Sequence, residues 1–206
     1  MNGARTTGRV LEIERRFEAP RDVVFALWTS PRQIVQWWGP RGHFLDHCEQ
    51  DFRVGGRWRF AIAGADGSSP TWTWGIYREI VAPERLVFSY SMDWHRHETL
   101  VSIAFEDLGD ATLMRFRQSE FLTDDDCADH SWGWLSALDK LADHISRMYS
   151  IGILNMDIFR IERPDGVAED IAEARRRAEQ DLRERPGDTV PPSVEARKSM
   201  VPPPQH

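Results

Sequence analysis

The sequence predicts an α+β protein in which a series of antiparallel strands is followed by one long helix. Residues from about 44 to 121 alternate between apolar and polar side chains, and turn residues separate the runs, as in a meander of strands. One short strand and two short helical segments come before this region. After it, apolar side chains recur at steps of three and four residues, which is the spacing of an amphipathic helix.

The first elements are predicted at residues 10–38. Residues 10–17 place apolar side chains at period two, and Arg15 interrupts them, which favours an edge strand. Helical spacing follows over residues 21–29. Ser30 and Pro31 then read as an N-cap with Pro at the first position of a second short helix. Gly39-Pro40 ends that helix.

Three strands of the central region carry a large share of the aromatic residues. Within each of three groups, the residues are spaced two apart and therefore lie on the same face of their strand. The groups are Trp58, Phe60 and Ile62; Trp72, Trp74 and Ile76; and Leu86, Phe88, Tyr90 and Met92. Because successive side chains of a strand point to opposite faces, we expect each group to point into the core.

The long helix is predicted to start after Thr123, which is followed by three Asp residues that favour the first helical turn. Gly133 within the helix costs roughly 1 kcal/mol relative to Ala. A close approach to the sheet, or to a bound group, would explain that cost. The apolar stripe of the helix consists of Leu135, Leu138, Leu141, Ile145 and Met148.

The 206 residues suffice for one large domain with extensions. We expect a flexible N-terminus at residues 1–9, the domain at 10–148, an appended and partly helical segment at 149–185, and a disordered, Pro-rich tail at 186–206. The appended segment is highly charged and carries only a thin apolar seam, which consists of Ile171, Ala174, Ala178 and Leu182.

Composition excludes several classes of protein. The formal net charge of -7 disfavours general binding to nucleic acid, which needs clustered Lys and Arg. The polar residues 1–9 lack the apolar core of a secretory signal, and no run of about 18 apolar residues predicts a membrane span. Cys48 and Cys127 are too few for a disulfide scaffold, so we expect a cytoplasmic location.

Four local motifs carry a resemblance to a known family. They are Trp-Trp-Gly-Pro at residues 37–40, the segments at 51–58 and 75–86, and His-Ser-Trp-Gly-Trp at 130–134. The chain resembles the START-like (SRPBCC) superfamily, in the branch of the homologues of the heat-shock-protein-90 ATPase activator. The resemblance implies a helix-grip fold, in which a curved antiparallel sheet with two short helices after its first strand wraps around the long C-terminal helix and leaves an apolar cavity.

The Trp and Phe side chains on alternating strand faces, together with this cavity, predict a binding module for a small hydrophobic or aromatic ligand, and we expect no cofactor. The residues expected to contact the ligand are Trp38, Trp58, Phe60, Trp74, Phe88, Tyr90, Met114, Phe116, Trp134 and Leu138. Two alternatives stay open. One is a co-chaperone-like domain of the stress response that contacts a protein partner. The other is a cyclase- or hydrolase-type enzyme that uses sparse polar groups, for which His130, Glu120 and Tyr77 are the candidates.

Two further patterns have simpler explanations. Gly55-Gly56 lacks the Lys-Ser or Lys-Thr and the helix of a phosphate loop, which favours a turn or bulge. His95 and His97 share a strand side, but a closed zinc site needs about four ligands and no partner motif accompanies them. We therefore expect no metal, and treat His43 and His47 as surface or core-edge residues.

Overall fold

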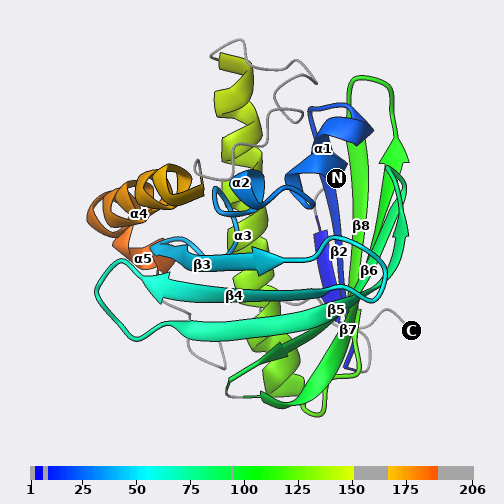
Figure 1. Ribbon diagram of the computed structural model, residues 1–206, viewed down its shortest axis with the longest axis horizontal. Helices are drawn as coiled ribbons and strands as arrows, with labels where there is room; N and C mark the ends of the chain where they lie inside the picture. Colours follow the sequence, from blue (N-terminus) through cyan, green and yellow to red (C-terminus); the bar gives the residue numbers. More distant parts are fainter. Residues whose placement is uncertain (1–2, 7–8, 94, 151–166, 190–206) are drawn as a thin grey trace.

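The structure of the protein is a computed structural model that describes residues 3–6, 9–93, 95–150 and 167–189. A long helix runs across a strongly bent sheet, and the two helices at Val167–Glu184 and Pro186–Thr189 lie to one side of this long helix (Figure 1). The elements in chain order are β1 (Gly3–Thr6), β2 (Leu11–Phe17), α1 (Arg21–Leu27), α2 (Pro31–Ile34), β3 (His43–Gln50), β4 (Arg57–Gly64), β5 (Thr71–Val81), β6 (Arg85–Met92), β7 (His95–Asp107), β8 (Thr112–Ser119), α3 (Asp124–Ser150), α4 (Val167–Glu184) and α5 (Pro186–Thr189).

The sheet confirms the predicted α+β, helix-grip architecture. Its eight strands are ordered β1-β2-β8-β7-β6-β5-β4-β3 and every neighbouring pair is antiparallel. The N-terminus differs from the expected flexible leader, since β1 pairs with β2. For the same reason β2 is not the edge strand that its Arg15 suggested. Arg15 instead reaches α3, where its guanidinium lies 2.6 Å from the Asp139 carboxylate.

The two short helices place a pair of tryptophans beneath the sheet. Pro31 occupies the first turn of α2, as predicted, and α2 ends at Ile34, so Trp37 and Trp38 lie in the turn that follows. Both rings are buried. The Trp37 indole N–H donates to the Leu27 carbonyl at the end of α1 (2.9 Å), which ties the turn to the first helix.

The face of β5 differs from the prediction. Thr73 and Tyr77 are buried, whereas Trp74 is 39% exposed on the outer face. Gly75 explains the difference, because a Cβ there would lie 1.8 Å from the Ser89 carbonyl oxygen and 2.7 Å from the Trp58 indole nitrogen. The large rings of neighbouring strands fill the space above β5. Its inner face therefore carries small residues beside Tyr77, and its tryptophans point outward.

The long helix follows its sequence signals. The Thr123 hydroxyl accepts a hydrogen bond from the Asp126 amide (3.1 Å), as an N-cap does. Leu138, Leu141, Ile145 and Met148 of the predicted stripe are buried in the main core, and Leu135 packs against it partly buried.

Helix α4 packs against β3, which is the edge strand at one end of the sheet (Figure 1). Ala174 and Ala178 of the predicted seam are buried there against Phe44 and Ala63, a cluster separate from the main core. The appended segment is thus helical over the residues of α4, and α5 occupies 186–189, where a disordered tail was expected. The remaining predictions for 151–166 and 190–206 lie outside the described residues.

A partly buried histidine makes the stability depend on pH. The His144 ring on α3 donates from Nε2 to the Gln33 Oε1 on α2 (2.8 Å), and burial, followed by the charges of Arg147 and Arg177, lowers its pKa to about 3. The unfolded chain takes up a proton at this ring below its ordinary pKa, near 6.5, while the folded chain does not. Stability is therefore lost as the pH falls from about 6.5 toward 3.

We expect the free energy of unfolding to be about 1–2 kcal/mol lower at pH 5 than at pH 7.5 because of His144. Urea unfolding at both pH values measures the difference. His144→Gln should reduce this difference, whereas the exposed His47→Gln should leave it unchanged. An equal pH dependence in wild type and His144→Gln would contradict the assignment.

Candidate functional site: a pocket between the long helix and the sheet

A pocket of about 210 Å³ lies between the first half of α3, the inner face of the sheet and the loop that follows α2. Its wall is mostly apolar, with a few polar groups from α3, β3 and β5. The lining residues are Trp38, Gly39, Pro40, His43, Ile62, Thr71, Tyr90, Met92, Asp129, His130, Trp132, Gly133, Trp134 and Ala137. This composition is that of a small-molecule site, in which apolar contacts supply affinity and sparse polar groups supply orientation.

The pocket exists partly because Gly133 carries no side chain. A Cβ at Gly133 would meet no atom within 4 Å, so the helix faces open space there. The close approach to the sheet that the sequence suggested is thus not the reason for this glycine. Its second suggested reason, space for a bound group, agrees with its position in the pocket wall.

Tryptophans that pack mostly edge to face form the inner wall. The Trp134 ring lies 5.1 Å from Trp38 and 6.0 Å from Trp28, measured between centroids. Trp38 lies 5.8 Å from Trp58, and Trp28 lies 4.6 Å from Trp37. Such ring pairs add stabilisation beyond their buried area. The wall is therefore held rigidly from behind by aromatic packing.

Gln118 on β8 organises the polar end of the pocket. Its amide nitrogen donates to the Thr99 hydroxyl (2.8 Å) and lies 3.0 Å from His130 Nδ1, while its oxygen accepts from the Trp134 indole N–H (2.8 Å). The Gln118 oxygen also lies 3.2 Å from His130 Nδ1, so both polar atoms of the amide face this ring nitrogen. The Thr99 hydroxyl in turn donates to the Tyr90 carbonyl (2.9 Å). One buried amide thus fixes the orientation of two pocket residues.

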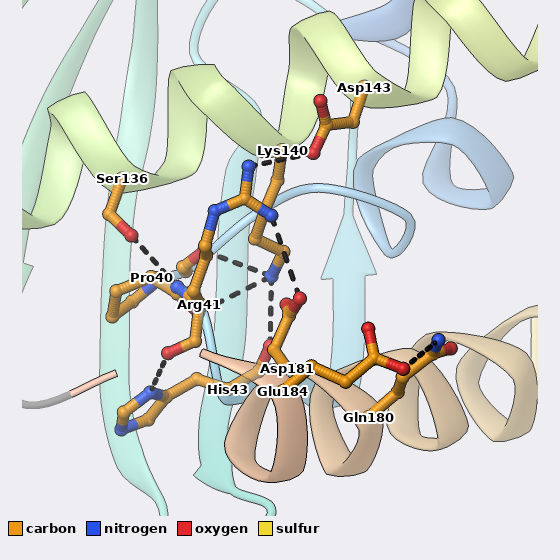
Figure 2. A network of polar contacts seen from close by, with 10 residues as sticks. Pro40, Arg41, His43, Ser136, Lys140, Asp143, Gln180, Asp181 and Glu184 are labelled. Carbon is orange, nitrogen blue, oxygen red and sulfur yellow. Dashed lines mark hydrogen bonds and ion pairs between the residues drawn. The ribbon is translucent and has the colours of Figure 1, made fainter. Parts of the chain in front are cut away.

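Lys140 of α3 holds the loop that forms the pocket's outer wall. Its amine donates to the carbonyl oxygens of His43 (2.8 Å) and Gly39 (3.0 Å), and lies 3.4 Å from that of Trp38 and 3.5 Å from that of Pro40. Figure 2 shows this amine enclosed between α3, the loop and α4. Burial lowers the pKa of Lys140 to about 7, and the carboxylate of Asp181 acts in the opposite direction.

Arg41 of the same loop is held from two helices. Its guanidinium lies 2.7 Å from the Asp143 carboxylate of α3 and 3.6 Å from that of Asp181 on α4. Its backbone N–H donates to the Ser136 hydroxyl (2.9 Å), and its carbonyl accepts from His43 Nδ1 (3.1 Å) (Figure 2). His43 is therefore neutral with its proton on Nδ1, and burial lowers its pKa.

The predicted ligand residues fall into four groups. Trp38, Tyr90 and Trp134 line the pocket. Trp58, Phe60 and Phe88 surround a second void of only about 10 Å³, so that part of the interior is filled. Three more are buried in the core outside the pocket wall, namely Met114, Phe116 and Leu138. Trp74 forms the fourth group, because its ring lies on the outer face of the sheet, away from the pocket, and is 39% exposed.

The three catalytic candidates do not form one cluster. His130 lines the pocket, whereas Glu120 is exposed, so the acid-base couple of these two residues is replaced by the buried contact of His130 with Gln118. Tyr77 lines the small second void, where its hydroxyl donates to Gln50 (2.9 Å). The geometry therefore assembles no acid, base and nucleophile from these three side chains.

Several pocket residues were not predicted as contacts from the sequence. Ile62 and Met92 were assigned to inward-facing groups without a ligand role, and Gly39-Pro40 was interpreted as a helix stop. Gln118 continues the inward alternation of Met114 and Phe116 on β8, which is the one signal that could have marked it as a buried polar group.

Two negative findings concern the described part of the chain. Within it, no group of three or more His, Cys, Asp or Glu side chains is arranged to hold a metal ion. None of its helices is long and apolar enough to cross a membrane.

Several solved structures have a fold similar to that of this chain. A protein from Chromobacterium violaceum has a similar structure, with 22% identity, a TM-score of 0.60 and coverage of 68% of this chain and 98% of its own. An AHSA1 protein from Silicibacter pomeroyi shows 24% identity and a TM-score of 0.60, covering 66% and 97%. A protein from Rhizobium leguminosarum shows 26% and 0.57, covering 71% and 99%.

A comparison of the sequence with family models agrees with these structural similarities. No curated protein sequence matches this chain significantly. The family model described as "Activator of Hsp90 ATPase homolog 1-like protein" matches residues 18–146, which contain the strands from β3 to β8, α1, α2 and most of α3. The chain therefore belongs to the Activator of Hsp90 ATPase homolog 1-like family.

Proposed function

We propose that the protein is a binding module for a small, flat aromatic or hydrophobic molecule, which it holds in the pocket between α3 and the sheet. The observation that carries the proposal is a pocket of about 210 Å³ whose wall contains Trp38, Tyr90 and Trp134. An apolar cavity of roughly 150 Å³ can hold benzene. A volume of about 210 Å³ therefore suits one or two fused rings.

The polar groups suggest how such a molecule would be oriented. His130 and Asp129 lie on α3, while His43 and Thr71 come from β3 and β5. Because His43 is neutral with its proton on Nδ1, its Nε2 is a hydrogen-bond acceptor. A ring that carries a hydroxyl or another neutral polar substituent matches this wall better than a pure hydrocarbon, since polar groups in such sites fix orientation.

The thiols support a role in a reducing compartment such as the cytoplasm. Cys48 and Cys127 are both free, and burial raises the pKa of each to about 12. Neither thiol is thus activated as a nucleophile, because the thiolate is the reactive form.

Titration with 2-naphthol and phenol tests the proposal. We expect 2-naphthol to bind in isothermal titration calorimetry, and phenol to bind more weakly because it buries less apolar area. Gly133→Leu should abolish binding, since its side chain would fill the open space at Gly133. Ser146→Leu is the matched control, as Ser146 is exposed on the same helix.

Three outcomes would count against the proposal. The first is that neither compound binds and native mass spectrometry of the purified protein shows no retained small molecule. The second is that Gly133→Leu binds as well as wild type, and the third is that Ser146→Leu loses binding equally. The second result would place the compounds outside this pocket, and the third would show that the loss in Gly133→Leu is not specific to the pocket.

A further inference from the structure

Helices α4 and α5 lie beyond the residues that the family model matches, yet they contact the wall of the pocket. The wall segment is the loop at residues 38–43, four of whose residues line the pocket. Lys140 holds this loop from the side of α3. The C-terminal helices hold it from the opposite side, as Figure 2 shows for α4.

The contacts from the C-terminal side are specific to Arg41 and Gly42. Asp181 lies 3.6 Å from the Arg41 guanidinium. Gly42 has a φ of +74°, and a Cβ there would lie 2.8 Å from Thr189 of α5 and 3.2 Å from Leu182 of α4. The loop backbone at Gly42 thus lies directly against both helices. Any side chain at Gly42 would push the loop away from α4 and α5.

The docking of α4 itself has a small apolar basis. Its two fully buried side chains are both alanines, which form a cluster with Phe44 and Ala63 apart from the main core, while Val167 and Ile171 pack against the main core only partly buried. Polar contacts supplement it. Arg32 of α2 pairs with Asp170 (2.7 Å), and Arg177 donates to Gln36. Elements with few buried apolar contacts open at low free energy, well before the core does.

We propose that α4 and α5 form a strap that clamps the pocket wall at residues 38–43, so that release of the strap loosens the wall while the core of the domain stays folded. The loop is then held only from the side of α3, by Lys140 and by the contacts of Arg41 with Asp143 and Ser136. Since a bound molecule would contact the same wall, its binding and the docking of the strap favour each other, as linkage requires. This last consequence rests on the proposed function, whereas the clamp does not.

Ala178→Glu tests the clamp, because it puts a carboxylate into the buried contact with Phe44 and Ala63. Ala172→Glu is the matched control: it is the same change on the same helix at an exposed position. Amide hydrogen exchange in the full chain is measured at Arg41 and His43, whose N–H groups donate to Ser136 and to the Pro40 carbonyl. Tryptic cleavage after Arg177 reports release of α4.

We expect Ala178→Glu to accelerate both cleavage after Arg177 and exchange at Arg41 and His43 at least tenfold, with exchange at Ile103 of β7 unchanged. Ala172→Glu should change neither. Asp181→Asn, which keeps the shape and removes the charge beside Arg41, should accelerate exchange at Arg41 at least threefold and serves if Ala178→Glu fails to fold. Faster cleavage without faster exchange in the loop would overturn the clamp, as would equal effects of both Glu variants.

The link to the pocket has its own readout. Saturating 2-naphthol should slow cleavage after Arg177 in the wild type at least threefold. Binding of 2-naphthol without any slowing would overturn the coupling. If 2-naphthol does not bind at all, the proposed function fails, and the exchange measurements still decide the clamp.

Discussion

Gly75→Ala is expected to destabilise the protein by about 3 kcal/mol, because its Cβ would collide with atoms that cannot move aside cheaply. The nearest is the Ser89 carbonyl oxygen at 1.8 Å, which belongs to the backbone of the neighbouring strand β6, followed by the Trp58 indole nitrogen at 2.7 Å. Chemical unfolding followed by tryptophan fluorescence measures the loss. Gly75 is buried on β5, which pairs with β4 on one side and with β6 on the other, so the strand pairing itself must shift to accept a methyl group.

Gly133→Ala is the matched comparison and should act in the opposite direction. The position is in the interior of α3 and a Cβ meets nothing within 4 Å. Ala in a helix interior is favoured over Gly by roughly 0.5–1 kcal/mol. The same added methyl group should therefore destabilise at one glycine and stabilise at the other. Two changes of the same sign would contradict the packing described for these positions.

Lys140→Met is expected to lower the free energy of unfolding by about 3 kcal/mol, because it leaves a group of backbone carbonyl oxygens without their donor. Met keeps most of the length of the side chain, so the lost stability reports mainly the lost hydrogen bonds. Urea unfolding at pH 6 measures it, since Lys140 has a pKa of about 7 and is mostly charged there.

Arg147→Met provides the control for Lys140→Met. It removes a cation from an exposed position of the same helix, two turns further on, and should change stability by less than about 0.5 kcal/mol. If Lys140→Met were as mild as this control, the carbonyl oxygens of the loop would be satisfied without the lysine. The loop would then not depend on α3 for its position.

The fold was predictable from the sequence because its signals are local. Alternation along the strands, the Thr123 N-cap and the apolar stripe of α3 each belong to one element, and the family motifs supplied their arrangement. The face of β5 was not predictable in this way. A shift of one residue exchanges the two faces of a strand, and on β5 the outward Trp74 looked more like a core residue than the inward Gly75 did.

The site was predictable only in part, since its shape depends on contacts between distant residues. Aromatic content pointed to Trp38, Tyr90 and Trp134, but it could not separate a ring beside empty space from one in a filled core, such as Phe88. The roles of Gln118 and Lys140 arise from partners on other elements. No spacing along the chain encodes that a lysine will meet the carbonyl oxygens of a loop about 100 residues earlier.

The closely packed tryptophans behind the pocket also allow its occupancy to be followed by the fluorescence of the protein. Trp28, Trp37, Trp38, Trp58 and Trp134 are linked by centroid distances of 4.6–6.1 Å. At such separations, electronic excitation passes between indoles before light is emitted. A molecule that quenches Trp38 or Trp134 from within the pocket therefore also lowers the fluorescence of tryptophans that it does not contact. The emission intensity of the whole cluster thus reports whether the pocket is occupied.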